Sequence, residues 1–312
     1  MMWTLYALLA GFGMDLLLGD PHGFPHPVVA IGKLISALEK LLRRVLPATP
    51  KGERLAGGIL WVLVTSISAG FPALLLWLCR SISPWLGLAV ESVMCWQILA
   101  AKSLRTESMK VYRALAAGDT EGARYAVSMI VGRDTSRLDR AGIARAAVET
   151  VAENTSDGVV APMVFLAIGG APLGFFYKAV NTMDSMLGYV EPPYRDIGFV
   201  PAKMDDVMNY LPARLSALLM LAAGALLGMD GGNGWRIFRR TVTTMPAPTP
   251  RRRSRCARAC WACVWRGTPG TTACSTGSPT LAIRFGRWSR RTSRAPAACC
   301  TARRSYPWRC AP

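Results

Sequence analysis

The run LAGGILWVLVTSISAGFPALLLWLC occupies residues 55–79, carries no charged side chain and is bracketed by Arg54 and Arg80. A helix needs about 20 apolar residues to cross the hydrocarbon core of a bilayer, so this run predicts a membrane-spanning helix. The alternative is a buried helix of a soluble protein, but such helices are rarely so long and so apolar. Residues 55–79 therefore favour an α-helical protein that is embedded in a membrane.

Four weaker apolar stretches extend this prediction to a polytopic protein. Each contains an interruption, which is Asp15, Glu91, the sequence GGAP and Arg214 in turn. The composition agrees, because 51% of the residues are hydrophobic and only 18% are charged, against about 25% charged residues in soluble domains. The sequence thus predicts an all-α, polytopic integral membrane protein with about five transmembrane helices. The four weaker helices are expected within residues 1–19, 84–101, 158–177 and 211–229.

The segments between these helices differ in charge, which bears on the topology. Residues 20–54 contain six Lys and Arg, residues 102–157 contain nine, and residues 181–210 contain two. Basic segments stay in the cytoplasm, so straight spans predict the first two segments inside and residues 181–210 outside. A different topology follows if residues 158–177 form a re-entrant hairpin that turns back at the GGAP sequence. Non-helical backbone at membrane depth is tolerated where protein covers it.

Residues 102–157 are too long for a simple loop and are predicted to be an amphipathic helical segment in the cytoplasm. From Ser136 to Ala152 the apolar positions recur at helical spacing. Thr135 or Ser136 is a suitable N-cap for this helix.

Polar residues gather at the edges of the apolar stretches. Asp20, His22 and His26 lie in a Gly- and Pro-rich loop after the first stretch and could bind a metal, although a solvated turn is the simpler interpretation. Arg133 lies in a GRDT sequence before the expected helix, whose N-terminus would favour an anion. An ordinary capped helix explains that sequence equally well.

Two further groups of polar residues precede and follow the stretch at residues 158–177. Glu149, Glu153 and Asp157 stand just before it. Carboxylates at a membrane boundary suit Mg²⁺ that is held together with nucleotide phosphates, and interfacial solvation is the alternative. The group at residues 178–214 is the densest, and so many paired polar side chains between apolar spans favour a functional site over a scaffold.

Several motifs in these groups, taken in order, resemble the CobD/CbiB family of cobalamin biosynthesis proteins. They cover about residues 5–240, and an ordered set of motifs is far more specific than any single one. The motifs are LGDP at 18–21, HPV at 26–28, VGRDT at 131–135, ETVAENTSDG at 149–158, KAVNTMDSM at 178–186 and PAKMDD at 201–206.

The resemblance implies a multi-pass enzyme of the cell (inner) membrane, of the adenosylcobinamide-phosphate synthase type. Such an enzyme is a carbon–nitrogen ligase that joins aminopropanol, or its O-phosphate, to the free propionate of a corrinoid, adenosylcobyric acid. ATP drives the reaction, since the carboxylate needs activation as an acyl phosphate, and Mg²⁺ is the expected metal. Lipid surrounds the enzyme, and a complex with other late cobalamin-synthesis membrane enzymes is compatible with this role.

Within these motifs, residue roles can be assigned as hypotheses. The expected metal ligands are Asp184, Asp205 and Asp206. The expected substrate- and phosphate-binding residues are Asp20, His26, Arg133, Lys178, Asn181, Lys203 and Arg214. The expected catalytic residues, which bind metal or accept a proton from the amine, are Glu149, Glu153 and Asp157.

Residues 246–312 differ from the membrane domain at residues 1–245. They contain 14 Arg, no Lys and no acidic residue, and they hold seven of the nine Cys. GC-rich codons give this composition when they are read out of frame, so we expect a disordered tail and a product that is inactive if the tail replaces part of the site. Cys256, Cys260 and Cys263 have the spacing of an iron–sulfur loop, but no barrel pattern surrounds them and no iron–sulfur cluster is expected.

Two alternatives from other classes remain open. A small-molecule transporter would fit an acidic residue within a span, as Glu91 is. A nucleic-acid or lipid-surface binder could be built on the Arg-rich run at residues 251–255. If the tail is an unstructured by-product, we expect no nucleic-acid partner.

Overall fold

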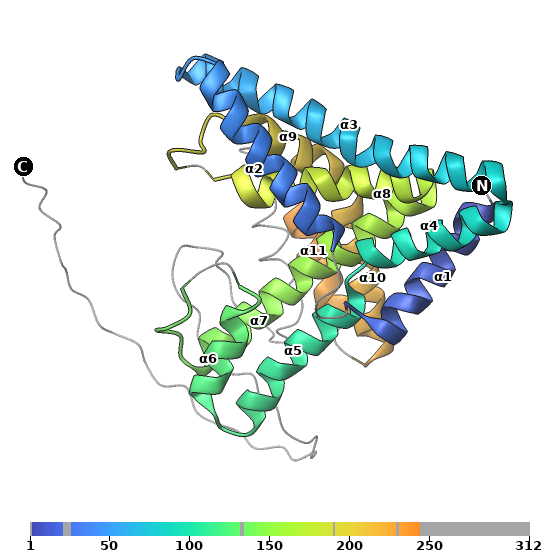
Figure 1. Cartoon of the computed structure of the whole chain (residues 1–312). Coiled ribbons are helices and arrows are strands. Elements are labelled where there is room, and N and C mark those ends of the chain that lie inside the picture. Colours follow the sequence, from blue (N-terminus) through green and yellow to red (C-terminus); the bar gives the residue numbers. More distant parts are fainter. Residues whose placement is uncertain (1, 21–25, 132–133, 190, 229–230, 244–312) are drawn as a thin grey trace, which may run out of the picture. The chain divides into compact units, whose positions relative to one another are not determined.

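The computed structural model describes residues 2–20, 26–131, 134–189, 191–228 and 231–243, and these form helices joined by short turns (Figure 1). No strand occurs within these ranges. The predicted tail at residues 246–312 lies outside them. The helices are α1 (Met2–Leu18), α2 (Pro27–Val45), α3 (Pro50–Ile82), α4 (Pro84–Ile98), α5 (Ala101–Ala116), α6 (Thr120–Ser128), α7 (Arg140–Thr155), the π-helical turn η1 (Ser156–Val160), α8 (Ala161–Leu187), α9 (Phe199–Met208), α10 (Tyr210–Leu226) and α11 (Gly231–Thr243).

The predicted all-α membrane fold is confirmed. By length and composition alone, three helical segments of the described chain could cross a membrane: Pro50–Ile82, Pro84–Ala116 and Arg140–Leu187. The last two include the polar helices α5 and α7, and the last one also folds back at Gly170. A fourth follows if α9 and α10, which meet at an angle of 46°, form one broken span. The first of the five expected spans is α1, a shorter apolar helix of 17 residues.

Proline residues set the starts of three helices. Pro27, Pro50 and Pro84 each occupy the first turn, where the missing N–H has no intrahelical partner and the fixed φ suits a helix. Two of these starts are also capped by the preceding side chain. His26 Nδ1 accepts from the Val28 N–H at 3.3 Å, and Thr49 Oγ1 accepts from the Gly52 N–H at 3.1 Å.

The long apolar helix α8 folds back on itself near its middle. Gly169 and Gly170 have non-helical backbone angles, with φ +65° at Gly170, a conformation that glycine adopts without steric cost. Phe165 stacks on Tyr177 with ring centroids 4.8 Å apart, although a dozen residues of continuous helix would separate them by about 18 Å. The Tyr177 hydroxyl also contacts the Asp157 carbonyl at 3.4 Å, across 20 residues. Residues 156–187 therefore form a helical hairpin.

This hairpin overturns the prediction that residues 181–210 lie across the membrane from residues 102–157. The Asp157 and Asp205 carboxylates interact electrostatically, and Asn209 accepts a hydrogen bond from Tyr177 at 2.8 Å. Groups so close cannot lie on opposite faces of a bilayer about 30 Å thick. The charge pattern misled because the intervening apolar stretch enters and leaves on one side. The re-entrant alternative, with its break at the GGAP sequence, is the correct one.

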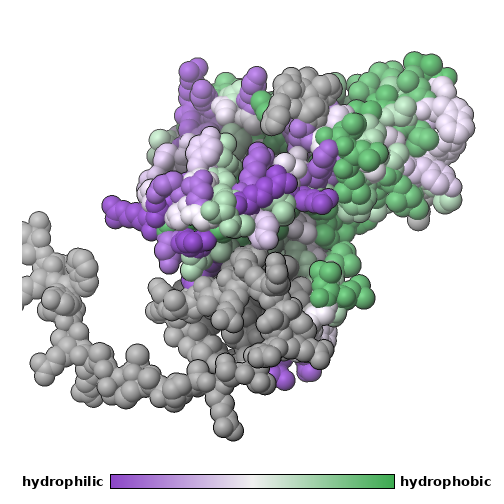
Figure 2. Space-filling view, turned by 90° about the horizontal axis from the view of Figure 1, so that it is seen from below, coloured by the Kyte–Doolittle hydropathy of each residue, from purple (hydrophilic) through white to green (hydrophobic). Residues whose placement is uncertain are grey.

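The segment between α4 and η1 is a polar helical bundle. Helices α5, α6 and α7 enclose a small core that contains Val111, Val127 and Ile143. Hydrophilic residues gather over this end of the molecule, whereas hydrophobic residues cover the end that holds α1 and α4 (Figure 2). The expected N-cap at Thr135 or Ser136 is wrong, because α7 begins at Arg140 and Asp139 caps it through the Gly142 N–H at 2.8 Å.

Candidate functional site

The candidate site lies at the open end of the hairpin, where four segments of the chain meet. These are the loop that follows α1, the turn η1, the second half of α8 and helix α9. The contacts that join them are carried by Asp20, Asp157, Lys178 and Asp205. All four come from motifs that the sequence singled out, so the fold brings together three groups that are far apart in the chain.

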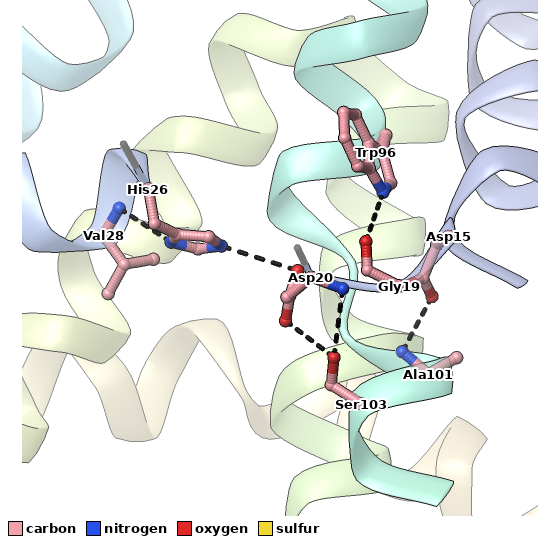
Figure 3. Close-up of polar contacts among 8 residues, drawn as sticks. All are labelled: Asp15, Gly19, Asp20, His26, Val28, Trp96, Ala101 and Ser103. Atoms are coloured by element: carbon pink, nitrogen blue, oxygen red, sulfur yellow. Dashed lines mark hydrogen bonds and ion pairs between the residues drawn. The ribbon is translucent and has the colours of Figure 1, made fainter. Parts of the chain in front are cut away.

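The loop after α1 is clamped onto the junction of α4 and α5 (Figure 3). Asp15 is completely buried, and its Oδ2 accepts from the Ala101 N–H at 2.8 Å, so that it caps the N-terminus of α5 from another helix. The Trp96 indole donates to the Gly19 carbonyl at 3.0 Å. Ser103 Oγ donates to Asp20 Oδ2 at 2.8 Å. These contacts fix Asp20 at the mouth of the hairpin.

His26 faces Asp20 from the start of α2. Its Nε2 lies 3.8 Å from Asp20 Oδ1, and its Nδ1 caps the helix through Val28. Partial burial lowers the pKa of His26, the nearby Asp20 carboxylate opposes this shift, and the Lys178 ammonium adds to it. The imidazole is therefore held in its neutral form near pH 7, because accepting a hydrogen bond at Nδ1 also requires that nitrogen to carry no proton.

The acidic wall of the site is built on α8, α9 and η1. The Asp205 carboxylate is acted on electrostatically by those of Asp184 and Asp157. The side chains of Asn181 and Asn209 hydrogen-bond to it, while its Oδ1 is buried without a hydrogen-bond partner in the described residues. A buried carboxylate oxygen that has no donor costs free energy. This oxygen is therefore a ready acceptor for a group that is not part of the chain.

Lys178 stands between the acidic wall and the clamped loop. The Asp157 and Asp20 carboxylates act on its ammonium from two sides, yet no carboxylate of the described residues lies within ion-pair distance of it. Its neighbours Tyr177 and Asn181 on α8 belong to the hydrogen-bonded wall. A cation in such a setting can bind an anionic group of a substrate, as the phosphate and carboxylate chemistry of lysine permits.

The residues fit a metal held jointly with a ligand better than a metal held by the protein alone. Among the described residues, no three His, Cys, Asp or Glu side chains converge as a metal cage requires. Mg²⁺ usually binds through one or two carboxylates and takes its other ligands from water and substrate phosphates. The unsatisfied Oδ1 of Asp205 beside Asp184 matches that mode. The metal role of Asp184, Asp205 and Asp206 stays a prediction.

The positions of several other predicted site residues do not assign them a role. Arg214 folds back on its own helix, with its guanidinium 3.6 Å from the Tyr210 ring centroid and its Nη1 donating to the Tyr210 carbonyl at 2.6 Å. Glu149 and Glu153 are partly buried on α7, as are Lys203 and Asp206 on α9. Their roles stay predictions.

The predicted anion site before α7 takes a different form. Arg133 lies outside the described residues, as does His22. The α7 N-terminus is already capped by the Asp139 carboxylate, and Asp134 accepts from the Ser136 N–H at 2.9 Å in an exposed turn, a hydrogen bond that lowers the pKa of Asp134. The anionic cap thus occupies the backbone donors that the prediction assigned to a ligand.

Sequence reasoning missed three residues that shape the site. Tyr177 links the hairpin to Asn209, Ser103 holds Asp20, and Trp96 holds the loop through Gly19. Tyr177 lies directly before the KAVNTMDSM motif, so its position could have drawn notice. Nothing in the sequence marks Ser103 or Trp96, because their partners are separated from them by 83 and 77 residues.

Comparison with known proteins places these motifs in a family. The family model described as CobD/Cbib protein matches residues 8–264. The cobalamin biosynthesis protein CbiB of Salmonella typhi is 48% identical over 236 residues, which are 76% of this chain and 73% of the relative. The cobalamin biosynthesis protein CobD of Clostridium perfringens is 45% identical over 233 residues, 75% of this chain and 73% of the relative. No solved structure matches the chain. The family match runs past Met245, so the first part of the predicted tail aligns with the family.

Proposed function

Because the chain belongs to the CobD/CbiB family and acts in cobalamin biosynthesis, we propose that it is an amide-forming ligase. The reaction joins aminopropanol, or its O-phosphate, to the free propionate of adenosylcobyric acid, and the product is adenosylcobinamide or its phosphate. The observation that carries the proposal is the arrangement of charges at the open end of the hairpin. There a lysine that has no ion-pair partner among the described residues lies beside carboxylates with an unsatisfied oxygen.

The two sides of the site suit the two reacting groups. Lys178 offers a positive charge to the propionate or to a phosphate group. Asp157 offers negative charge to the ammonium of the amine, which has to lose a proton before it attacks. Glu149 and Glu153, which precede Asp157 on the same helical run, are further candidates to accept that proton. Holding both reactants in one geometry is the larger part of catalysis in such a ligation.

ATP and Mg²⁺ complete the proposed reaction. The propionate is a poor electrophile until it is converted to an acyl phosphate, and ATP supplies that phosphoryl group. Asp184, Asp205 and Asp206 would hold Mg²⁺ together with the phosphates, and the metal would neutralise phosphate charge. Lys203, Arg214 and Arg133 are candidate phosphate contacts.

The site faces the cytoplasm of the cell in this proposal, and the protein lies in the inner membrane. The hairpin puts the site on the same side as the polar bundle of α5, α6 and α7, and basic segments are retained in the cytoplasm. ATP and the corrinoid are both available there. Membrane lipid surrounds the apolar helices, and other late enzymes of cobalamin synthesis in the membrane are the proposed partners.

The tail at residues 246–312 is proposed to be an out-of-frame product, although the family model aligns as far as residue 264. Its 14 Arg without one Lys or acidic residue supports this, and such a sequence change would remove part of the family fold and the activity with it. Sequencing the coding DNA tests the idea directly. A reading frame that continues the family sequence after a one-base shift supports it, and an uninterrupted frame with independent support from close relatives contradicts it.

A ligation assay tests the proposed function. Membranes that contain either the full chain or a version whose tail has its reading frame restored receive adenosylcobyric acid, ATP, Mg²⁺ and aminopropanol phosphate, and the corrinoid product is identified by mass spectrometry. Asp157→Asn and Lys178→Met are expected to lower the rate at least about 100-fold, since each removes a charge that meets a reactant. Glu121→Gln, at an exposed position on α6, is the matched control and should keep the full rate.

Two outcomes distinguish a loss of activity caused by the tail from a failure of the proposed function. Ligation that appears only after the reading frame of the tail has been restored would assign the loss to the tail and keep the proposal. Failure of both proteins to ligate would refute the proposal, and ATP-independent uptake of a corrinoid into sealed vesicles would favour a transporter instead.

A further inference from the structure

Glu91 is a charged residue in the apolar part of the chain. It lies beside the turn of α8, whereas the candidate site lies at the open end of the hairpin. It lies on α4, and only 1% of its surface is exposed. Its Oε2 pairs with Arg80 Nη2 at 2.6 Å, and Arg80 itself is half exposed at the end of α3. Ionisable residues within membrane helices are costly, and they are retained where they perform a task. None of the ligation chemistry above uses this pair.

The other oxygen of Glu91 meets the turning point of the hairpin. Oε1 accepts from the Ala171 N–H at 3.4 Å. A Cβ atom at Gly170 would lie 2.3 Å from the same oxygen, so the carboxylate rests directly against the backbone of the turn. Ala171 is where the returning half of α8 begins, with Pro172 next to it. A carboxylate at a helix N-terminus is favourable because it satisfies free N–H groups and the helix dipole.

The returning half of α8 carries the central part of the site. Tyr177, Lys178, Asn181 and Asp184 all lie on it, and it begins at the residue that Glu91 holds. A helix advances about 1.5 Å for each residue. A turning point displaced by one residue would therefore shift Lys178 along the helix axis by about that distance, which is enough to misalign reacting groups.

We propose that Glu91, oriented by Arg80, is a positioning residue that fixes the turning point of the hairpin and thereby the depth at which α8 presents Lys178 to the site. Glu91 acts as an N-cap supplied by a neighbouring helix, and Arg80 compensates its charge. The consequence for ligation rests on the proposed function, whereas the consequence for the hairpin does not.

Hydrogen exchange of the full chain in lipid nanodiscs, read by mass spectrometry on peptides that cover residues 168–175, tests the proposal. The main variant is Arg80→Met with Glu91→Leu, which removes both charges together and so leaves no unpaired charge on the buried Glu91 side, since apolar replacement of both partners of an ion pair is often neutral for stability. We expect exchange at residues 168–175 to become at least about ten-fold faster at an unchanged unfolding temperature, while the α5–α6–α7 bundle exchanges as before. Glu91→Gln keeps an oxygen acceptor for Ala171 and should retain most of the protection.

A second variant covers the case in which the double variant does not fold. Gly170→Ala leaves both charges in place and forces a Cβ against Glu91 Oε1, so it should open the same peptide, whereas Gly58→Ala, where a Cβ meets nothing within 4 Å, should not. Unchanged exchange at residues 168–175 in the double variant or in Gly170→Ala would overturn the proposal, as would faster exchange spread evenly over the protein.

Ligation by the same variants tests the link to the site. The rate should fall in the order of lost protection, from the unaltered chain through Glu91→Gln to the double variant. Lost protection with a full ligation rate would overturn that link. Lost protection in a protein that shows no ligation even when unaltered would support the hairpin role and count against the proposed function alone.

Discussion

Ser103 and Asp20 lie 83 residues apart and exchange two hydrogen bonds: the Ser103 hydroxyl donates to Asp20 Oδ2 at 2.8 Å and accepts from the Asp20 N–H at 3.3 Å. Ser103→Ala should free the carboxylate from α5 and lower the ligation rate about ten-fold, because Asp20 would no longer be held beside Lys178. Steady-state kinetics on membranes would measure this. Ser108→Ala on the same helix, where the hydroxyl donates to the Arg105 carbonyl within its own helix, should have no effect.

Asp15 should matter for stability through its acceptor oxygen and not through its charge. Asp15→Ala leaves the buried Ala101 N–H without its partner and should lower the free energy of unfolding by about 1–3 kcal/mol. Asp15→Asn keeps an oxygen acceptor and should cost less than about half of that. Thermal unfolding in detergent compares the two variants. Equal losses for both would show that the negative charge, and not the cap of α5, is what stabilises the fold.

Two adjacent glycines of α3 provide a matched test of how the segment before α9 is held. A Cβ at Gly57 would lie 2.1 Å from the Ile197 carbonyl oxygen, whereas a Cβ at Gly58 would meet nothing within 4 Å. Gly57→Ala should therefore destabilise the protein by about 1–3 kcal/mol through overpacking. Gly58→Ala should be neutral or stabilising by up to about 1 kcal/mol, because alanine favours a helix. Unfolding midpoints of the two variants in the same detergent provide the comparison.

An ion pair also holds the segment before α9 against α3. Arg54 Nε lies 2.9 Å from Asp196 Oδ1. A Gly57→Ala variant as stable as the unaltered chain would show that the segment at Ile197 moves aside freely, and that the ion pair alone sets its position.

The stability of the protein should fall as the pH drops below about 6.5. Burial lowers the pKa of His26 in the folded protein, with Asp20 opposing and Lys178 reinforcing the shift. The unfolded chain therefore takes up a proton near the usual histidine pKa of about 6.5, before the folded protein does. The contribution of His26 is complete above that pH and is lost as the pH falls through the folded pKa. Unfolding temperatures between pH 8 and pH 5 would show the decline, and His26→Asn, which keeps a capping oxygen but does not titrate, should flatten it.

Hydropathy and motif order were enough to predict the membrane fold, and they named most of the residues that the structure brings together at the open end of the hairpin. Residues 55–79 predicted α3. The HPV motif put His26 among the candidate residues, but its place as the N-cap of α2 was not predicted. The motifs also put Asp20, Asp157, Lys178, Asn181, Asp184 and Asp205 on a common candidate list, and the structure brings these residues together. Local sequence signals suffice here because each motif lies at the end of an apolar helix.

The topology could not be predicted from charge counts. The positive-inside rule assumes that every long apolar stretch crosses the bilayer, and α8 does not, because it turns at Gly170. The sequence GGAP raised that possibility without deciding it, since the decision depends on whether Glu91 and the neighbouring helices cover the turn. The N-cap at Asp139 was missed for a similar reason: several Ser, Thr and Asp residues precede α7, and only packing selects one of them.

The doubled-back helix α8 has a consequence for how the protein is assembled. Its contacts with the other apolar helices are mainly with α1, α2, α3 and α4, all of which precede it in the chain. A polypeptide emerging from the ribosome would have these four elements in place before the hairpin is synthesised. The non-helical backbone at Gly169 and Gly170 is not tolerated in contact with lipid. When the hairpin inserts, the helices that cover this backbone are thus already in place.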